Sequence, residues 1–473
     1  MGLAAAVVWL ALLALPGGET LAAPLAQPAA GHTFTVNSTA DVFDFNPGDG
    51  KCDVTSGSHI CTLRAAVQEV DAGPGGDTIR LQPNTTYRLT QPDGQNPLYY
   101  GNLDITESVT LLGAGPESTI IDGNGAVTGE RVFDILTGTV TISGVTIQNG
   151  KAQNVGGDIL NDGLLTLLNS RVLSGTVDGL NDWGGGIASG GALTVTGSLV
   201  SGNQTGAHNS YGGGLMNYSI GLLTVIDSTV SNNLTVPNGS AGGLGGGISG
   251  QVRVVNSTIS GNTGASGGGL YATGNSVILN STISGNHATA AGGGLYLHGG
   301  GLSLYNVTVA DNLANSDSSG SGDGGGVAVE IGTFNFLNSI LDDNNQIVST
   351  GGPFPFLYRD NCAGTVNALG FDLLGDNDNP VTHCTVSGTP SSADPLLGPL
   401  QANGGPTLTM ALLPGSPAID AGNPGGCDDD LGAPITSDQR GAPRPANLTG
   451  ATRCDIGAYE VQRTLFLPML RRS

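Results

Sequence analysis

Hydrophobic and polar positions repeat along the middle of the chain, most clearly between Gly245 and Asn312. Each copy opens with three glycines and an apolar residue. It continues with alternating apolar positions such as Val252 and Val254, and closes with a segment like Asn-Ser-Thr-Ile. Alternation predicts a strand with one face turned inward and the other outward. Self-similarity of this kind indicates a repeat architecture and constrains the fold before any local feature does.

Two polar residues lie six positions apart in every copy, as Asn256 and Asn262 do. Asn, Asp and Gly tolerate the left-handed backbone conformation, so both positions are predicted to be sharp corners. The β-branched residues between them, Thr258 and Ile259, favour a short strand. One repeat is therefore predicted to run as strand, corner, strand, corner, variable loop and glycine-rich strand. The same spacing recurs at Gly197 and Asn203, Asp227 and Asn233, Asn280 and Asn286, Asn306 and Asn312, and Asn338 and Asn344.

These repeats predict an all-β fold, a right-handed parallel β-helix (solenoid) over residues 101–346. A single coil cannot bury its apolar face, so coils must stack, with Ile259 and Ile283 inside and corner Asn side chains joined in ladders. Propeller blades need about 40 residues per repeat, whereas corresponding Asn residues here lie 24 to 32 positions apart. Leucine-rich repeats need a Leu skeleton and nonapeptide calcium repeats need a fixed Asp, and the sequence has neither pattern.

Residues 31–100 do not repeat and contain one candidate helix. Thr62 can cap its start, and Leu63, Ala66, Val67 and Val70 form an apolar side. A short amphipathic helix before a solenoid can cover the open end of the first coil, whose edge would otherwise pair with other chains. We therefore expect an N-terminal capping helix.

The segment from Phe34 to Tyr87 resembles the CSLREA domain of secreted bacterial proteins. The resemblance is carried mainly by Cys-Thr-Leu-Arg-Ala-Ala at 61–66 and Gly-Asp-Thr-Ile at 76–79. The family motif departs at Thr62, where it has Ser, and at Ala65, where it has Glu. This resemblance implies export and a β-helix after the domain, but no particular activity.

Residues 347–473 form a different region, in which Pro, Cys and Asp become frequent and the repeat stops. The segments 415–422, 438–441 and 454–460 resemble the choice-of-anchor Q domain found at the end of secreted β-helix proteins. That resemblance implies a cell-surface protein. The last residues, 465–473, carry no LPxTG sequence and no long apolar helix.

Export is also indicated by the first 30 residues, 1–30. Leu3 to Leu15 is an apolar run too short to span a bilayer, and small residues follow it, as in a secretory signal peptide. Cysteine usage fits the same compartment, because six cysteines fall outside the repeat body in three local pairs. By proximity we expect the disulfides Cys52–Cys61, Cys362–Cys384 and Cys427–Cys454.

The net charge argues against some classes of binding partner. With 15 Lys and Arg against 38 Asp and Glu, the net charge of −23 argues against nucleic acid and anionic membrane surfaces. We expect a monomer without a transmembrane segment in the mature chain. Its partner would be an extracellular polysaccharide or a cell-surface glycan.

Catalysis is the main competing interpretation, since right-handed β-helices include pectate lyases and polygalacturonases. A lyase needs a base, often Arg or Lys, beside calcium-binding carboxylates. Between residues 156 and 345 the only Arg or Lys residues are Arg171 and Arg253. Of the polygalacturonase segments only an Asp pair, Asp342-Asp343, is present. The sequence therefore favours a binding or adhesion protein; a polysaccharide lyase or glycoside hydrolase is the alternative, and a structural spacer is a third.

Two candidate sites follow from local patterns. Tyr271 and Tyr296 occupy the same place in adjacent repeats and are predicted to point outward as a strip two rings long, suited to a sugar face. The alternative is a ladder that only stabilises the sheet. The acidic loop with Asp41, Asp44, Asn46 and Asp49 is the second candidate, for calcium. A turn held by Asx hydrogen bonds is its alternative.

Overall fold

The computed structural model describes residues 31–92, 101–179, 181–206, 209–219, 221–236, 243–317, 322–348, 355–379, 384–446 and 453–462. The chain divides into two units, Met1–Ala30 and Gly31–Ser473, and all described residues belong to the second. The expected signal peptide at 1–30 and the sorting segment at 465–473 lie outside the described residues. Within these ranges no helix is long and apolar enough to cross a membrane.

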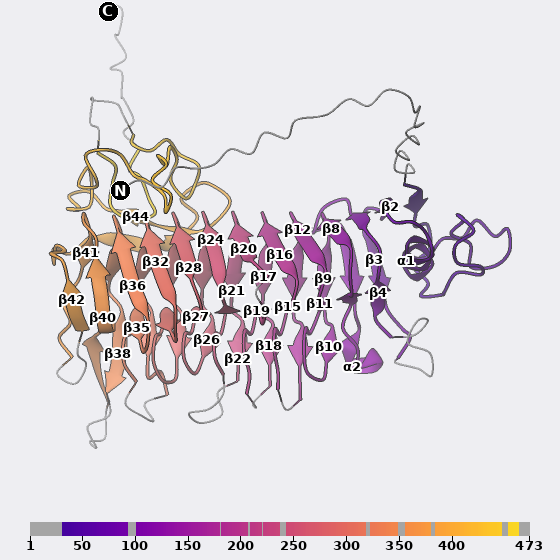
Figure 1. The fold of residues 1–473 in the computed structure, drawn as a ribbon, viewed down its shortest axis with the longest axis horizontal. Helices are drawn as coiled ribbons and strands as arrows, with labels where there is room; N and C mark the ends of the chain where they lie inside the picture. Colours follow the sequence, from indigo (N-terminus) through magenta and orange to yellow (C-terminus); the bar gives the residue numbers. More distant parts are fainter. Residues whose placement is uncertain are drawn as a thin grey trace, which may run out of the picture. The chain divides into compact units, whose positions relative to one another are not determined.

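Coils in the body of the helix carry four short strands, and successive coils pair in parallel (Figure 1). One coil contains β27 (Leu270–Ala272), β28 (Ser276–Leu279), β29 (Thr282–Ser284) and β30 (His287–Ala288). We call the four stacks sheets I to IV, in chain order. The parallel β-helix is thus confirmed. The two-residue strands of sheet IV were not predicted, because they lie in the segment expected to be a variable loop and are too short to show alternation.

Sheet I contains β4 (Leu103–Ile105), β7 (Phe133–Ile135), β11 (Ile159–Asn161), β15 (Ile187–Ser189), β19 (Leu215–Asn217), β23 (Ile248–Gly250), β27, β31 (Leu295–Leu297), β35 (Val327–Val329) and the start of β40 (Cys362–Ala368). Sheet II contains β1 (Thr33–Thr35), β2 (Asp77–Arg80), β5 (Val109–Leu112), β8 (Thr139–Ser143), β12 (Leu164–Leu168), β16 (Ala192–Thr196), β20 (Leu223–Ile226), β24 (Val252–Val255), β28, β32 (Gly301–Tyr305), β36 (Thr333–Leu337), the end of β40 and β42 (Cys384–Ser387).

Sheet III contains β3 (Thr85–Arg88), β6 (Thr119–Asp122), β9 (Thr146–Gln148), β13 (Arg171–Leu173), β17 (Leu199–Ser201), β21 (Thr229–Ser231), β25 (Thr258–Ser260), β29, β33 (Thr308–Ala310), β37 (Ile340–Asp342) and β41 (Leu373–Leu374). Sheet IV contains β10 (Lys151–Ala152), β14 (Thr176–Val177), β18 (Gln204–Thr205), β22 (Leu234–Thr235), β26 (Thr263–Gly264), β30, β34 (Leu313–Ala314), β38 (Asn345–Val348) and the antiparallel β39 (Phe356–Arg359). Two helices, α1 (Leu63–Ala72) and α2 (Gly125–Thr128), and the hairpin β43 (Leu397–Gln401) with β44 (Thr409–Leu412) complete the described elements.

Parallel stacking extends beyond the expected limits of 101 and 346 on both sides. Strand β1 pairs with β2, which pairs with β5, so the N-terminal region supplies strands to sheet II as well as a cap. At the other end β40 pairs with both β35 and β36, and β42 adds one more strand to β40. These strands lack the Asn-x-x-x-x-x-Asn spacing of the body, which is why the sequence pattern did not reveal them.

The core is a column of inward apolar side chains, as the alternation indicated. Ile259, Ile283 and Val309 follow one another in sheet III and are fully buried. Burying one such side chain contributes roughly 1.5–3 kcal/mol, so the stacked coils stabilise each other mainly through this column. The inward placement of Ile259 and Ile283 is confirmed.

An Asn ladder runs beside this core at the second corner of each coil. Each side-chain Nδ2 donates to the Oδ1 of the next Asn in the ladder over 2.9–3.0 Å. The main-chain N–H of the same Asn donates to that oxygen as well, as at Asn262 and Asn286. The predicted ladder is therefore present. It consists of Asn203, Asn233, Asn262, Asn286, Asn312, Asn344 and Asn361.

The second corner itself differs from the prediction. The first corner is left-handed as expected, with φ of 50° at Asn256 and 51° at Asn280. At the second corner the left-handed residue is the one before the ladder Asn, as at Gly261 (φ 65°) and Asp311 (φ 60°). The Asn residue that follows turns its amide inward, because there it satisfies buried backbone groups.

Helix α1 is confirmed with its predicted cap and apolar side. The Thr62 hydroxyl accepts the N–H of Ala65 at 3.1 Å, and Gly73 ends the helix. Arg64 on this helix is almost fully buried against Asp41, with 2.6 Å between Nε and Oδ1. Since a buried charge is tolerated only when it is paired, this ion pair ties the loop before the helix to α1, and Arg64 also donates to the carbonyls of Gly101 and Asn102 just before β4.

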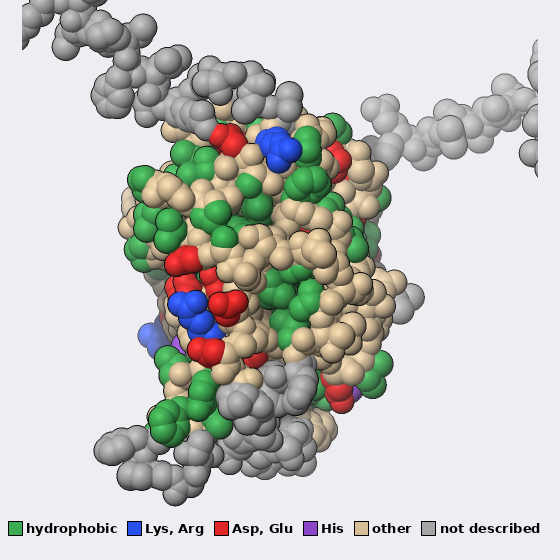
Figure 2. Space-filling model, turned by 90° about the vertical axis from the view of Figure 1, so that its left-hand side faces the viewer, with side chains coloured by type: hydrophobic (Ala, Val, Ile, Leu, Met, Phe, Trp, Pro, Cys, Tyr) green, Lys and Arg blue, Asp and Glu red, His purple; other side chains and the backbone are tan. Residues whose placement is uncertain are grey.

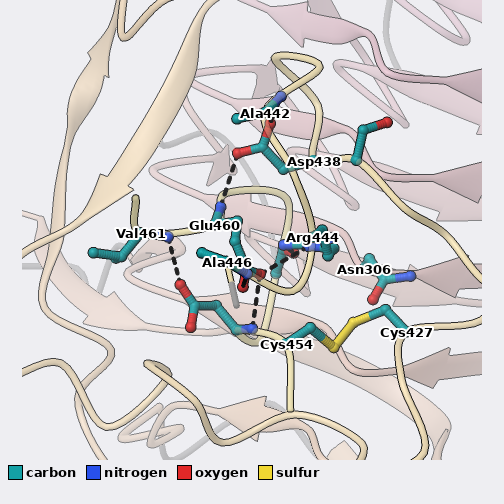
Figure 3. A network of polar contacts seen from close by, with 12 residues as sticks. Asn306, Cys427, Asp438, Ala442, Arg444, Ala446, Cys454, Glu460 and Val461 are labelled. Carbon is teal, nitrogen blue, oxygen red and sulfur yellow. Dashed lines mark hydrogen bonds and ion pairs between the residues drawn. A yellow bond between two sulfur atoms is a disulfide. The ribbon is translucent and has the colours of Figure 1, made fainter. Parts of the chain in front are cut away.

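All three predicted disulfides are present, at Cys52–Cys61, Cys362–Cys384 and Cys427–Cys454. The last disulfide lies within a segment that we call the C-terminal strap, which comprises the described residues of 395–462. Its centre is a buried polar network, drawn in Figure 3. There Arg444 Nε lies 3.0 Å from Glu460 Oε2, and the Glu460 N–H donates to Asp438 Oδ2 at 2.9 Å.

The strap packs against sheet III through a row of outward threonines. Thr258 Oγ1 donates to the Leu408 carbonyl at 2.6 Å, and Thr282 Oγ1 donates to Gln439 Oε1 at 2.6 Å. In the next coil Thr308 Oγ1 accepts the Ala458 N–H at 3.1 Å. One segment of the chain is thus bonded to three successive coils.

The end opposite α1 is formed by the coil of β42. Figure 2 looks onto this end, where hydrophobic side chains lie beside acidic and basic ones. Exposed apolar residues near this end include Val386 in β42, and Leu369 and Phe371 between β40 and β41. Both described helices lie in the first half of the chain, so neither plays the part of a cap here.

Candidate functional site

The outward face of sheet I brings the two predicted tyrosines together. Tyr271 and Tyr296 are direct neighbours in the parallel register, and their rings stack with centroids 5.4 Å apart and planes 7° apart. Tyr271 is only 5 % exposed, however, because other rings pack on it, whereas Tyr296 is half-buried. Tyr271 therefore supports the surface more than it forms it.

The aromatic surface is longer than the predicted two rings. Tyr211 meets Tyr271 edge-on at 6.3 Å, Trp183 meets Tyr211 edge-on at 6.3 Å, and Tyr218 lies 5.8 Å from Trp183 between ring centroids. We call Trp183, Tyr211, Tyr218, Tyr271 and Tyr296 the aromatic strip. Rings in such tilted and stacked contacts hold one another in fixed orientations.

The additional rings were missed because they occupy other positions of the repeat. Trp183 and Tyr211 each stand directly before a glycine triplet. In the structure the two residues form a parallel β-bridge with each other. Between the coils of Tyr211 and Tyr271, the outward residue of sheet I is the small Ser249, which leaves room for the two rings to meet. The sequence signal that could have identified them is an aromatic residue directly before a glycine triplet.

Each end of the aromatic strip carries a carboxylate bonded to a tyrosine. The Tyr218 hydroxyl donates to Asp162 Oδ1 at 2.5 Å, and the Tyr296 hydroxyl donates to Glu330 Oε2 at 2.8 Å. The same Glu330 oxygen lies 2.5 Å from His298 Nδ1, and these contacts lower the pKa of Glu330. Both carboxylates are exposed, so they can also meet a ligand.

Next to Asp162, sheet I continues with an acidic pair. Asp104 and Asp134 are register neighbours, and Asp134 Oδ2 lies 2.7 Å from Arg131 NH1. Burial, with the Asp134 charge second, raises the pKa of Asp104 to about 6. The Arg131 guanidinium also donates to the carbonyls of Gly156 and Val155, which fixes it beside Asp134. A carboxyl group with a pKa of about 6 can donate or accept a proton near neutral pH.

The acidic loop proposed for calcium has other contacts. Asp41 is engaged by Arg64 and by the N–H groups of Thr90 and Gln91. The remaining predicted ligands form Asx contacts with one another and with nearby N–H groups, over 2.8–3.4 Å, at Asp44, Asn46 and Asp49.

A hollow of about 410 Å³ opens beside this loop, lined by Asp44, Asn46 and Asp49 among others, and not by Asp41. In the part of the chain that the structure describes, no three His, Cys, Asp or Glu side chains form a group able to hold a metal ion. The calcium site stays a prediction, and the contacts themselves are those of the Asx turn.

Comparison with known proteins finds a likeness among solved structures. No family model matches the chain, and no curated protein matches it. Among solved structures, the chain is similar to one described as "Crystal structure of pectate lyase Pel9A", with 15 % sequence identity and a TM-score of 0.49. That likeness covers 92 % of this chain and 97 % of the other.

Proposed function

We propose that this protein is a secreted or cell-surface protein that binds an extracellular polysaccharide along the aromatic strip. The observation that carries the proposal is the row of five aromatic side chains on one face of sheet I, ended by the carboxylates of Asp162 and Glu330. Apolar sugar faces pack on aromatic rings, and carboxylates and phenols bond sugar hydroxyls.

The strip suits a long ligand better than a compact one. Trp183 precedes β15 and Tyr296 lies in β31, four coil steps later in sheet I. At a strand spacing of about 4.8 Å these steps cover roughly 19 Å along the solenoid axis. An extended glycan lying parallel to that axis would contact several rings at once.

Export supports the same function. Three disulfides fit an oxidising compartment, and the apolar run within 1–30 fits a secretory signal peptide. The resemblance to the CSLREA domain supports export, and the resemblance to the choice-of-anchor Q domain supports a place at the cell surface.

Binding on a glycan array by the variants Trp183→Ala and Tyr296→Ala tests this function. Both side chains are half-buried, so each variant should fold, and we expect about tenfold weaker binding if each loses one stacking contact. Tyr305→Ala is the matched control, since Tyr305 is a half-buried tyrosine on sheet II. Equal binding by all three variants would contradict the proposal.

A polysaccharide lyase or hydrolase is the second candidate, favoured by the group of Asp104, Asp134 and Arg131 on the same face. Incubation with pectate, alginate and neutral glycans, followed by an assay for new reducing ends, separates the two functions. Binding without product supports the first candidate. Product formation that Asp134→Asn abolishes would establish the second.

A further inference from the structure

We infer that the aromatic strip selects polysaccharides whose sugars carry free amino groups, rather than uronic acids. This inference rests on the proposed function and names the class of ligand for that site. It arises from charge: both ends of the strip are anionic, through Asp162 at one end and Glu330 at the other.

Charges along the described outward face of sheet I support this selection. Its carboxylates are Asp104, Asp134, Asp162 and Glu330, and its one guanidinium is that of Arg131. Arg131 is already engaged by Asp134 and by two backbone carbonyls. At the other end His298 is engaged by Glu330 in the same way. A uronate chain laid along the strip would therefore meet like charges, while Arg131 and His298 are already held by carboxylates, whereas an ammonium group would be attracted.

The two end carboxylates are placed to accept hydrogen bonds from such a ligand. The Tyr218 hydroxyl bonds Asp162 Oδ1, and the Tyr296 hydroxyl bonds Glu330 Oε2. These bonds use Oδ1 of Asp162 and Oε2 of Glu330, and both side chains are exposed, so a ligand can approach the second oxygen of each carboxylate. A sugar ring on Tyr296 or Tyr218 would bring a ring substituent next to that oxygen. Hydrogen bonds between an ammonium and a carboxylate are about twice as strong as neutral ones.

The tyrosine–carboxylate bonds also fix the geometry. A phenol that donates to the carboxylate holds both the ring plane and the acceptor in place. Stacking and charge recognition then act on the same sugar. This coupling distinguishes a site on the strip from the general attraction of any cation to a chain with a net charge of −23.

Calorimetric titration with three short oligomers of equal length tests the inference. The probes are a β-1,4-linked glucosamine oligomer, its fully N-acetylated counterpart and an oligogalacturonate, all at near-physiological salt. We expect the glucosamine oligomer to bind at least about tenfold more tightly than the acetylated one, the equivalent of one charge-assisted hydrogen bond. The galacturonate should bind most weakly.

The double variant Asp162→Asn with Glu330→Gln should lose this preference while it still binds the acetylated oligomer. Asp178→Asn is the matched control, because it removes an exposed carboxylate that follows β14 in sheet IV and pairs with Lys151 rather than with a tyrosine of the strip. It should leave the preference unchanged. Both sets of substitutions lie at exposed side chains, and circular dichroism verifies that each variant is folded.

The outcomes separate the two proposals. Failure of all three oligomers to bind would overturn the proposed function and the inference together. Equal or tighter binding of the acetylated oligomer or the galacturonate would overturn the inference alone. Glucosamine binding that survives in the Trp183→Ala, Tyr296→Ala double variant would also overturn it, since the attraction would then be spread over the acidic surface.

Discussion

At the scale of single residues, the ladder asparagines carry out a task that no apolar residue could. Asn286 Nδ2 donates to the Ile259 carbonyl and to Asn312 Oδ1, each over 2.9 Å, and its Oδ1 accepts the N–H of Asn262. One buried side chain thereby satisfies groups in three consecutive coils. Buried polar groups need hydrogen-bond partners, and the Asn side chain supplies them to the backbone at this corner, so the corner can be buried without water.

Asn286→Ala should therefore be strongly destabilising. It leaves the Asn262 N–H and the Ile259 carbonyl without the amide, and each unsatisfied buried group costs roughly 1–3 kcal/mol. We expect a loss of about 3 kcal/mol in urea unfolding. The exposed Asn275→Ala serves as control and should change stability by less than about 0.5 kcal/mol.

Asp104 gives a second prediction at this scale. Burial raises its pKa from 3.8 to about 6, so the native state binds this proton more tightly than the unfolded chain does. The stabilisation from that proton is complete below the unfolded pKa and is lost as pH rises through 6. Asp104→Asn should raise the melting temperature at about pH 7.5 and change it little near pH 4. An equal shift at both pH values would show that the charge is not responsible.

At the scale of elements, the sequence predicted those with a strong local pattern, but not those that form only through pairing with adjacent coils. The helix α1 could be predicted because Thr62 and the apolar positions Leu63 to Val70 lie close together in sequence. The two-residue strands of sheet IV, such as Thr263–Gly264, form only through pairing with adjacent coils. A sequence without its neighbours does not contain that information.

The same distinction explains the candidate site. Tyr271 and Tyr296 share a repeat position, so their contact followed from the period alone. Trp183 and Tyr211 stand before the glycine triplets, and their meeting with Tyr271 depends on ring orientation across coils. Stacking order can be predicted from a repeat, whereas contacts between different repeat positions require three-dimensional packing.

The capping helix offers a test at this scale through Arg64→Ala. The substitution leaves Asp41 as a buried carboxylate without its cation, which typically costs about 3–5 kcal/mol. We expect that loss in chemical unfolding, together with greater protease cleavage of residues 31–92. Arg80→Ala, at an exposed arginine of β2, is the control. Matching stability of the two variants would argue that the ion pair has no role in the cap.

At the scale of the whole described unit, the C-terminal strap ties coils that otherwise contact only their nearest neighbours. Gln439 is central, since its side chain bonds Thr258 and Thr282 in adjacent coils and Leu408 within the strap. These amide contacts are buried. The strap therefore adds longer-range coupling to a one-dimensional stack.

Gln439→Ala should weaken this coupling. Removing the amide leaves the buried Thr258 and Thr282 hydroxyls with fewer partners, at a cost of about 2 kcal/mol in the free energy of unfolding. Gln401→Ala, on the exposed side of β43, provides the comparison and should be nearly neutral. A neutral Gln439→Ala would mean that the strap is held by other contacts.

The row of threonine contacts under the strap has a consequence for how the protein comes apart. A solenoid tied only between neighbours can fray from its end, one coil after another. Here the coils of Ile259, Ile283 and Val309 are bound to one crosswise segment, so an opening that begins at the last coil cannot advance through them singly. Native-state hydrogen exchange should find the amides of these three coils opening together with the strap as one cooperative block, while Val172 and Val200, whose coils carry none of these three threonine contacts, open separately.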